Sequence, residues 1–222
     1  MKAMILSAGF GTRLAPLTNN IPKALILHKN KPLVNYQIVH LKRYGVDEII
    51  VNSHHHFEKI AKYFKENDFG VKVRVIVENE ILGTGGGILN ASEYFKNEKF
   101  FIVINVDVET DFDLTEMIKH HDSSSPLATL AIQKRVTKKF LEFDGKMYLT
   151  GREHPGSEKK NLYAFNGIHI ISCEIFNRKI EIGFKDIIDI YLDLITKGDL
   201  VQGFDTGSCT FKDLGKRENL QI

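Results

Sequence analysis

Two glycines and two basic residues follow the first apolar run of the chain. The run Ala3–Leu6 ends shortly before Gly9 and Gly11, and Arg13 and Lys23 come next. Glycine lets the backbone come close to a ligand, and the N–H groups of such a loop suit phosphate oxygens. Arginine adds a planar set of donors, and lysine adds a mobile positive charge. We therefore expect this loop to bind a polyanion.

Two common phosphate-binding loops do not fit this segment. The dinucleotide fingerprint needs a third glycine at the position of Leu14, and the P-loop needs a Gly-Lys-Ser/Thr ending that the segment lacks. A Gly-x-Gly pair alone also occurs in ordinary turns. The pattern therefore argues against a NAD-binding oxidoreductase and against a P-loop enzyme.

Carboxylates that could hold a metal ion lie far apart in the sequence. Asp107 follows an apolar run in Asn105-Val106-Asp107. Magnesium bound to phosphates takes only one or two protein carboxylates, which makes Asp107 the first candidate ligand. An aspartate after a strand is also common in turns, and Asp213 taken alone is more typical of a helix cap.

A second glycine-rich segment spans Gly83–Gly87. It could form a flexible turn, or it could bring the backbone close to the edge of a nucleobase. Thr84 is a candidate N-cap for the helix that follows.

Three consecutive histidines, His54, His55 and His56, raise the question of a zinc site. Adjacent side chains at the end of a strand point in alternating directions, so they rarely share one ion. We expect a polar loop here.

Strands and helices alternate through the first half of the chain. Apolar runs predict strands, and apolar residues at helical spacing predict helices. The predicted strands are 3–6, 48–52, 71–77 and 100–104, and the predicted helices are 33–41, 57–64 and one opened by 83–87. This order predicts an α/β fold with a Rossmann-like, mixed but mainly parallel sheet and helices on both faces. Ligands of such sheets bind beyond the carboxyl ends of the strands, where both glycine segments and Asp107 fall.

The pattern is less regular beyond Asp113. Predicted there are helices 114–121 and 184–196, a short helix from 216, strands 128–134, 161–171, 200–204 and 209–214, and a hairpin at 140–150. We expect one domain, 1–222, in which residues 108–170 form an insertion-like part over the rim of the sheet.

Composition excludes several classes of protein. The chain has 222 residues, 43% of them hydrophobic, which is enough for one domain with a real core. The net charge of +2 favours neither nucleic acid nor a membrane surface as a partner. Two cysteines without metal-ligand spacing fit a reducing compartment, and we see no signal peptide, so a cytoplasmic protein is expected.

The complete run G-x-G-T-R-L-x-P-L-T from Gly9 to Thr18, with Pro22-Lys23 after it, resembles the signature of the nucleotide-sugar pyrophosphorylases. These nucleotidyltransferases join a nucleoside triphosphate to a sugar 1-phosphate. The resemblance extends from Lys2 to about Glu218. It implies in-line attack of the sugar phosphate on the α-phosphorus, release of pyrophosphate and no general base.

The resemblance also implies roles for residues that match the family's motifs. Asp107 and Asp213 would hold Mg²⁺, Arg13 and Lys23 would be the catalytic cations, and the 108–170 region would serve the sugar. Asn166 and Gly167 would contact the sugar. The implied nucleotide-binding residues are Ala8, Gly9, Gly11, Thr12, Arg13, Lys23, Gly83, Thr84, Gly85 and Asn105. The expected partners are an NTP and a sugar 1-phosphate.

The run Leu82–Ile88 resembles the short members that include MurNAc-1-phosphate uridylyltransferase, which favours UTP and MurNAc-1-phosphate. GTP with mannose or heptose 1-phosphate is the alternative, and a non-catalytic nucleotide-sugar-binding subunit is another. The chain departs from the family pattern at Val106, where glycine is usual, and at Lys216, where threonine is usual. It also lacks a Glu-Lys-Pro motif. These departures affect the identity of the sugar more than the reaction.

Overall fold

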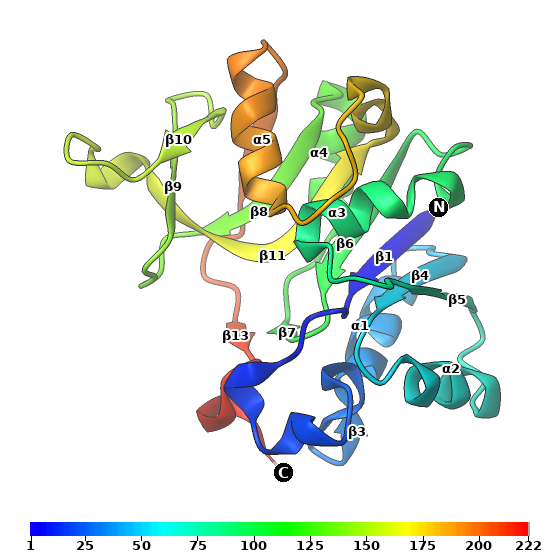
Figure 1. Cartoon of the computed structure of the whole chain (residues 1–222). Coiled ribbons are helices and arrows are strands. Elements are labelled where there is room, and N and C mark those ends of the chain that lie inside the picture. Colours follow the sequence, from blue (N-terminus) through cyan, green and yellow to red (C-terminus); the bar gives the residue numbers. More distant parts are fainter. Residues whose placement is uncertain (222) are drawn as a thin grey trace.

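Four parallel strands form the centre of the computed structural model, which describes residues 1–221 (Figure 1). They are β1 (Lys2–Leu6), β4 (Glu48–Ser53), β5 (Lys72–Val77) and β6 (Phe100–Asn105), in the spatial order β6-β1-β4-β5. The chain moves outward from β1 to β5 and then returns to place β6 on the other side of β1. Such a reversal leaves a crevice at the carboxyl ends of the two strands, where ligands of α/β sheets bind.

The second half of the chain extends the same sheet. The long strand β11 (Leu162–Ser172) pairs antiparallel with β6, with β8 (Ala128–Gln133) and with β9 (Phe140–Phe143). Strand β10 (Leu149–Arg152) completes the predicted hairpin with β9, and β12 (Val201–Asp205) lies parallel to β8. The predicted mixed, mainly parallel sheet is confirmed. The stretch 108–170, expected to lie over the rim, contributes four of these strands to the sheet itself.

Two small sheets lie outside the central one. Strand β7 (Val108–Thr110) pairs with β13 (Phe211–Asp213), and β2 (Leu27–His28) pairs with β3 (Lys31–Pro32). The first pair matters for the site because β7 follows Asp107 directly and β13 ends at Asp213. Short 3₁₀-helices fill many of the connections: Thr12–Leu14, Leu17–Asn19, Lys23–Leu25, Ser92–Tyr94, Lys159–Asn161, Cys173–Arg178 and Arg217–Asn219.

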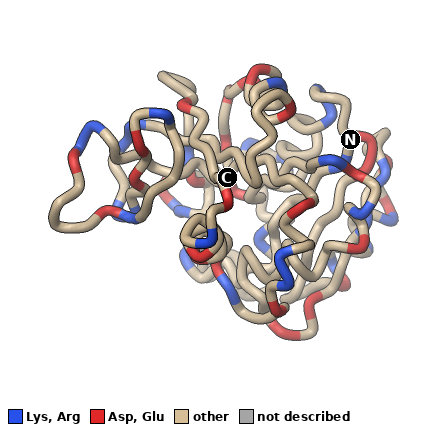
Figure 2. The backbone as a smooth tube through the Cα atoms, turned by 90° about the horizontal axis from the view of Figure 1, so that it is seen from above, with Lys and Arg blue, Asp and Glu red and all other residues tan. Residues whose placement is uncertain are grey.

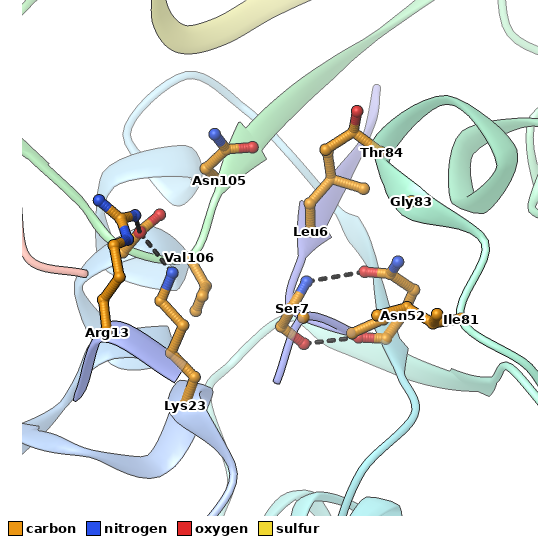
Figure 3. Close-up of a pocket in the computed structure, with 13 residues that line it drawn as sticks. Leu6, Ser7, Arg13, Lys23, Asn52, Ile81, Gly83, Thr84, Asn105 and Val106 are labelled. Atoms are coloured by element: carbon orange, nitrogen blue, oxygen red, sulfur yellow. Dashed lines mark hydrogen bonds and ion pairs between the residues drawn. The ribbon is translucent and has the colours of Figure 1, made fainter. Parts of the chain in front are cut away.

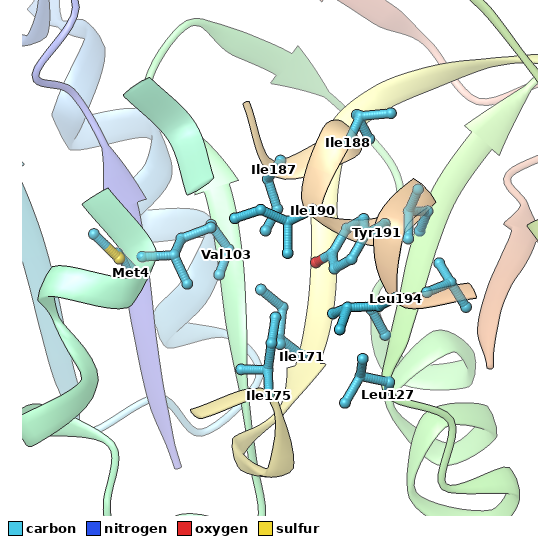
Figure 4. Packing of buried hydrophobic residues seen from close by; sticks show 14 of the residues in the cluster. Met4, Val103, Leu127, Ile171, Ile175, Ile187, Ile188, Ile190, Tyr191 and Leu194 are labelled. Atoms are coloured by element: carbon cyan, nitrogen blue, oxygen red, sulfur yellow. The ribbon is translucent and has the colours of Figure 1, made fainter. Parts of the chain in front are cut away.

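Helices cover both faces of the sheet. Helices α1 (Leu33–Lys42), α2 (Phe57–Glu66) and α4 (Thr115–Ser124) pack on one face, and α3 (Gly83–Asn90) and α5 (Ile187–Thr196) pack on the other. Alternate residues of β1 face the two layers, so Ala3 and Ile5 belong to the first core and Met4 to the second. Figure 4 shows Met4 and Val103 of the sheet with Tyr191 of α5. A strand buried on both faces explains the continuous apolar run from which it was predicted.

The starts of α3 and α5 differ from the prediction. The N-cap of α3 is Leu82, and Thr84 lies within the first turn, so the predicted N-cap at Thr84 is wrong. Its hydroxyl instead accepts a hydrogen bond of 2.9 Å from the N–H of Ile187. Helix α5 begins at Ile187 instead of residue 184, because the carboxylate of Asp186 accepts the N–H of Ile188 as an N-cap.

Charged residues of both signs are interspersed along the chain (Figure 2). The net charge of +2 is therefore not concentrated in one long stretch of sequence. None of the helices within residues 1–221 is long and apolar enough to cross a membrane.

The glycines of α3 are required by close packing, which predicts a stability effect. A Cβ at Gly86 would collide with the carbonyl oxygen of Gly183, a backbone atom that cannot rotate away. We expect Gly86→Ala to lower the free energy of unfolding by about 1–3 kcal/mol, as overpacking does. Denaturant unfolding measures this change. Gly145→Ala is the matched control because nothing lies within 4 Å of its Cβ position, and equal stability of the two variants would contradict the prediction.

Candidate active site

A cavity of about 240 Å³ opens at the crevice between β1 and β6 (Figure 3). Its walls come from the ends of three parallel strands, the first glycine loop and the start of α3. The lining residues are Leu6, Ser7, Ala8, Gly9, Arg13, Lys23, Asn52, Ile81, Gly83, Thr84, Asn105, Val106 and Asp107. Most of the predicted nucleotide-binding residues are therefore brought together at one site.

Three predicted nucleotide-binding residues, Gly11, Thr12 and Gly85, are not among the lining residues. Gly11 has a positive φ of 64°, and a Cβ there would lie 2.9 Å from the side chain of Thr18 and 3.2 Å from that of Lys23. Its glycine is therefore required by the fold of the loop.

Four side chains of alternating charge stand at the mouth of the cavity. The ammonium of Lys23 donates a hydrogen bond to Asp107 Oδ2, and Arg13 Nη1 donates to Asp213 Oδ2 at 2.7 Å. Arg13 Nη2 also lies 3.9 Å from Asp107 Oδ2. Burial raises the pKa of Asp213, but the hydrogen bond and charge of Arg13 outweigh it and hold that pKa below its ordinary value. The carboxylate of Asp213 is thus kept ionised beside the cavity.

The two carboxylates face one space, and Gly215 keeps that space open. A Cβ at Gly215 would touch the carboxylate oxygens of both Asp107 and Asp213. Two carboxylates with room between them fit a magnesium ion that takes its other ligands from phosphates and water. Within residues 1–221, no group of three or more histidine, cysteine or acidic side chains forms a candidate metal site. Asp107 and Asp213 would thus supply only two of the ligands of such an ion.

A buried polar network supports the opposite wall of the cavity. Asn52 Oδ1 accepts the N–H of Ser7 at 2.8 Å, and Asn52 Nδ2 donates to Glu78 Oε1 at 2.7 Å. The second oxygen of Glu78 accepts the N–H of Leu82 at 3.0 Å. The network ties the end of β1 to the segment before α3. The sequence analysis missed Asn52 and Glu78, although both are polar residues at the carboxyl ends of predicted strands.

A second cavity of about 270 Å³ adjoins the first and shares Thr84 and Asn105 with it. It is lined by the start of α5, the middle of β11 and the β9–β10 hairpin. Its other lining residues are Thr137, Lys139, Leu141, Arg152, Phe165, His169, Asp186, Ile187 and Ile188. None of these was predicted as a site residue, because they come from four separate stretches of the sequence without a common motif.

The predicted sugar contact Asn166 lines neither cavity. Its side chain is buried, where Oδ1 accepts a hydrogen bond of 2.9 Å from Arg135 and Nδ2 donates to Thr206 Oγ1 at 3.2 Å. Gly167 has a φ of 73°, and a Cβ there would lie 2.7 Å from Asn105 Nδ2. In the structure Gly167 therefore makes room for Asn105, the residue that the two cavities share. The sugar-binding roles of both residues stay predictions.

Comparison with known proteins shows the family of this chain. The family model described as Nucleotidyl transferase matches residues 2–220. The chain therefore belongs to the nucleotidyl transferase family. The two curated relatives named below are sugar-1-phosphate nucleotidyltransferases by name. The predicted membership of the nucleotidyltransferases is therefore confirmed.

Individual relatives differ in how much of their length is matched. The chain is 32% identical to D-glycero-alpha-D-manno-heptose 1-phosphate guanylyltransferase of Campylobacter jejuni, over 80% of this chain and 78% of that protein. It is 34% identical to UTP--glucose-1-phosphate uridylyltransferase of Synechocystis sp., but spans only half of that relative. Most of the curated relatives are matched over about half of their length or less. The crystal structure of HddC from Yersinia pseudotuberculosis is 26% identical, with a TM-score of 0.80 over 98% of this chain and 95% of that one.

Burial of His169 in the wall of the second cavity predicts a pH effect on stability. Burial lowers the pKa of His169 to about 3 from its ordinary value of 6.5. Between these values the unfolded chain binds a proton that the folded chain excludes, so stability falls as the pH drops. We expect this residue to contribute a slope of about 1.4 kcal/mol per pH unit below pH 6.5.

Urea unfolding at several pH values between 7 and 4 measures this slope. His169→Gln should reduce the slope by about 1.4 kcal/mol per pH unit, which corresponds to one proton. The same change at the exposed residue His55 should leave the slope unchanged. The same slope in His169→Gln as in the original protein would contradict the prediction.

Proposed function

We propose that this protein is a sugar-1-phosphate nucleotidyltransferase that uses GTP and a mannose- or heptose-type sugar 1-phosphate. The observation that carries the reaction is the arrangement of Arg13 and Lys23 against Asp107 and Asp213 at the crevice between β1 and β6. Two cations and two carboxylates at one cavity are the groups that a transfer between phosphates requires.

The geometry supports in-line attack of the sugar phosphate on the α-phosphorus of the triphosphate. The attacking oxygen is already anionic, so the reaction needs no general base. Lys23 is mostly buried, with 14% of its side chain exposed, and suits the crowded position between the two phosphates. Arg13 is more exposed, at 57% of its side chain, and would neutralise the leaving pyrophosphate. A divalent cation held by Asp107 and Asp213 would neutralise part of the phosphate charge.

Each of the two adjoining cavities would bind one of the two substrates. The nucleotide would occupy the cavity of the glycine loop, with its base near Asn52 and Gly83. The sugar would occupy the second cavity, where Lys139, Arg152 and Asp186 offer polar contacts. Asn105 lies between the two and would contact the reacting phosphate groups from the end of β6.

The choice of GTP depends on the relatives that this chain spans over most of their length. One is the heptose 1-phosphate guanylyltransferase, and another is HddC, also solved in complex with GMP-PN at 27% identity. The Leu82–Ile88 run keeps UTP with MurNAc-1-phosphate as the second candidate, as the sequence indicated. A non-catalytic binding subunit is less favoured, because all four charged residues are present and lie in contact.

Pyrophosphate release in the presence of Mg²⁺ tests the proposal. GTP and UTP would each be combined with mannose, heptose, glucose and MurNAc 1-phosphates. We expect turnover with GTP and one of the first two sugars, with kcat/KM about 100-fold above that with UTP. Turnover with UTP and not with GTP would contradict the choice of GTP and favour the second candidate, UTP with MurNAc-1-phosphate. Binding of a nucleotide sugar without turnover of any pair would favour the non-catalytic subunit.

The role of Asp107 leads to a separate prediction. Asp107→Asn removes a carboxylate charge and the ionic partner of Lys23, and we expect kcat to fall by about 10²–10³-fold while the protein stays folded. Circular dichroism and steady-state kinetics measure the two properties. Asp122→Asn, an exposed surface change on α4, is the control and should leave kcat unchanged. An unaltered kcat in a folded Asp107→Asn variant would show that this carboxylate has no role in the reaction.

A further inference from the structure

A third cavity lies between α1 and β7, lined by residues that do not line the two cavities already described. Its volume is about 460 Å³, the largest of the three. The residues that matter for its chemistry are Lys31, Gln37, His40, Arg43 and Glu109. Nothing in the proposed reaction uses this cavity.

Two residues that line the cavity each carry a buried polar atom that has no hydrogen-bond partner within residues 1–221. These atoms are Nε2 of His40 and Oε2 of Glu109. Burying such atoms is unfavourable unless a ligand or water satisfies them. Burial and the nearby Arg43 lower the pKa of His40 to about 4, so the ring is neutral at pH 7. Each atom can therefore form a hydrogen bond with a neutral polar group.

The cavity also carries an excess of positive charge. Neither Lys31 nor Arg43 forms an ion pair or a side-chain hydrogen bond with the rest of the described chain. The charge of Glu109 is already neutralised by protein groups. Its Oε1 accepts from Lys29 at 2.7 Å and lies 3.3 Å from His28, and Lys212 Nζ lies 3.8 Å from Oε2, beyond hydrogen-bond distance. Two cations are thus available to an anion, and Glu109 can still accept a hydrogen bond through Oε2.

We propose that this cavity binds a small phosphorylated polyhydroxy compound. Its phosphate would be held by Lys31 and Arg43, and its hydroxyl groups would satisfy Glu109 Oε2 and His40 Nε2. The shared chemistry is that of a phosphate ester on a sugar. A free sugar phosphate and a nucleotide both carry it.

The walls of the cavity are connected to the carboxylates of the active site. Gln37 Nε2 donates hydrogen bonds to the carbonyl oxygens of Val106, at 3.2 Å, and Val108, at 2.6 Å. These two residues flank Asp107. Glu109 lies in β7 opposite Lys212, one residue before Asp213. A ligand in this cavity would therefore shift both Asp107 and Asp213, which gives it a regulatory effect on the proposed reaction.

Isothermal titration calorimetry tests the binding without any turnover. A negative binding result would therefore contradict this inference without contradicting the proposed function. The probes are glucose 6-phosphate and GMP, titrated into the Lys23→Gln protein to weaken binding at the active site. We expect one site, with affinity reduced about tenfold or more by a further Arg43→Glu change. Lys65→Glu, the same charge change at an exposed residue of α2, is the control and should leave the affinity unchanged.

Either probe binding in this way supports the proposal, and the tighter probe identifies the source of the ligand. No binding of either probe, or equal weakening by Arg43→Glu and Lys65→Glu, would overturn it. The regulatory effect is tested by the probe's influence on the KM for the NTP in the original protein and in Arg43→Glu. An effect that is absent, or equal in the two proteins, would overturn the connection to Asp107.

Discussion

Alternating charges tie together three stretches of the chain that are far apart in the sequence. Arg13 and Lys23 come from the first loop, Asp107 from the end of a central strand and Asp213 from near the C-terminus. Partly buried charges are costly unless they are paired, so this network requires all three stretches to be in place. It also keeps the local charge balanced. When a substrate binds, its phosphate groups can replace the aspartates as partners of Arg13 and Lys23, and its cation can replace the basic residues as the partner of Asp107 and Asp213. Each charge would then still have a partner of opposite sign.

The central sheet could be predicted from the sequence because its signals are local. The apolar run before Gly9 and the alternation of strands and helices are visible within short windows, and they place the glycine loop and Asp107 at one edge. The predicted role of Asp213 needed the family resemblance, since Asp213 taken alone is more typical of a helix cap. Its contact with Arg13 spans 200 residues in sequence and leaves no local pattern.

The second cavity could not be predicted for a related reason. Its polar residues Lys139, Arg152 and Asp186 come from segments that are far apart in the sequence and that meet beside β11, which pairs antiparallel with both β6 and β9. Asn166 has the residue type of a sugar ligand, but it turns inward to hold Arg135, whose guanidinium packs 4.2 Å from the ring centre of Phe211 in β13. A residue's chemical type therefore did not reveal which way its side chain points.

The glycine segment of α3 and the start of α5 are joined backbone to backbone. Gly85 donates its N–H to Lys185, Lys185 donates to Leu82, and the hydroxyl of Thr84 receives the N–H of Ile187. One of these segments lines the first cavity and the other lines the second. The cavities proposed for the nucleotide and for the sugar are thus lined by parts of one structural unit. Exchange of one of these segments alone between relatives would break the hydrogen bonds that join them. A chimaera that keeps these contacts must therefore take both segments from the same parent.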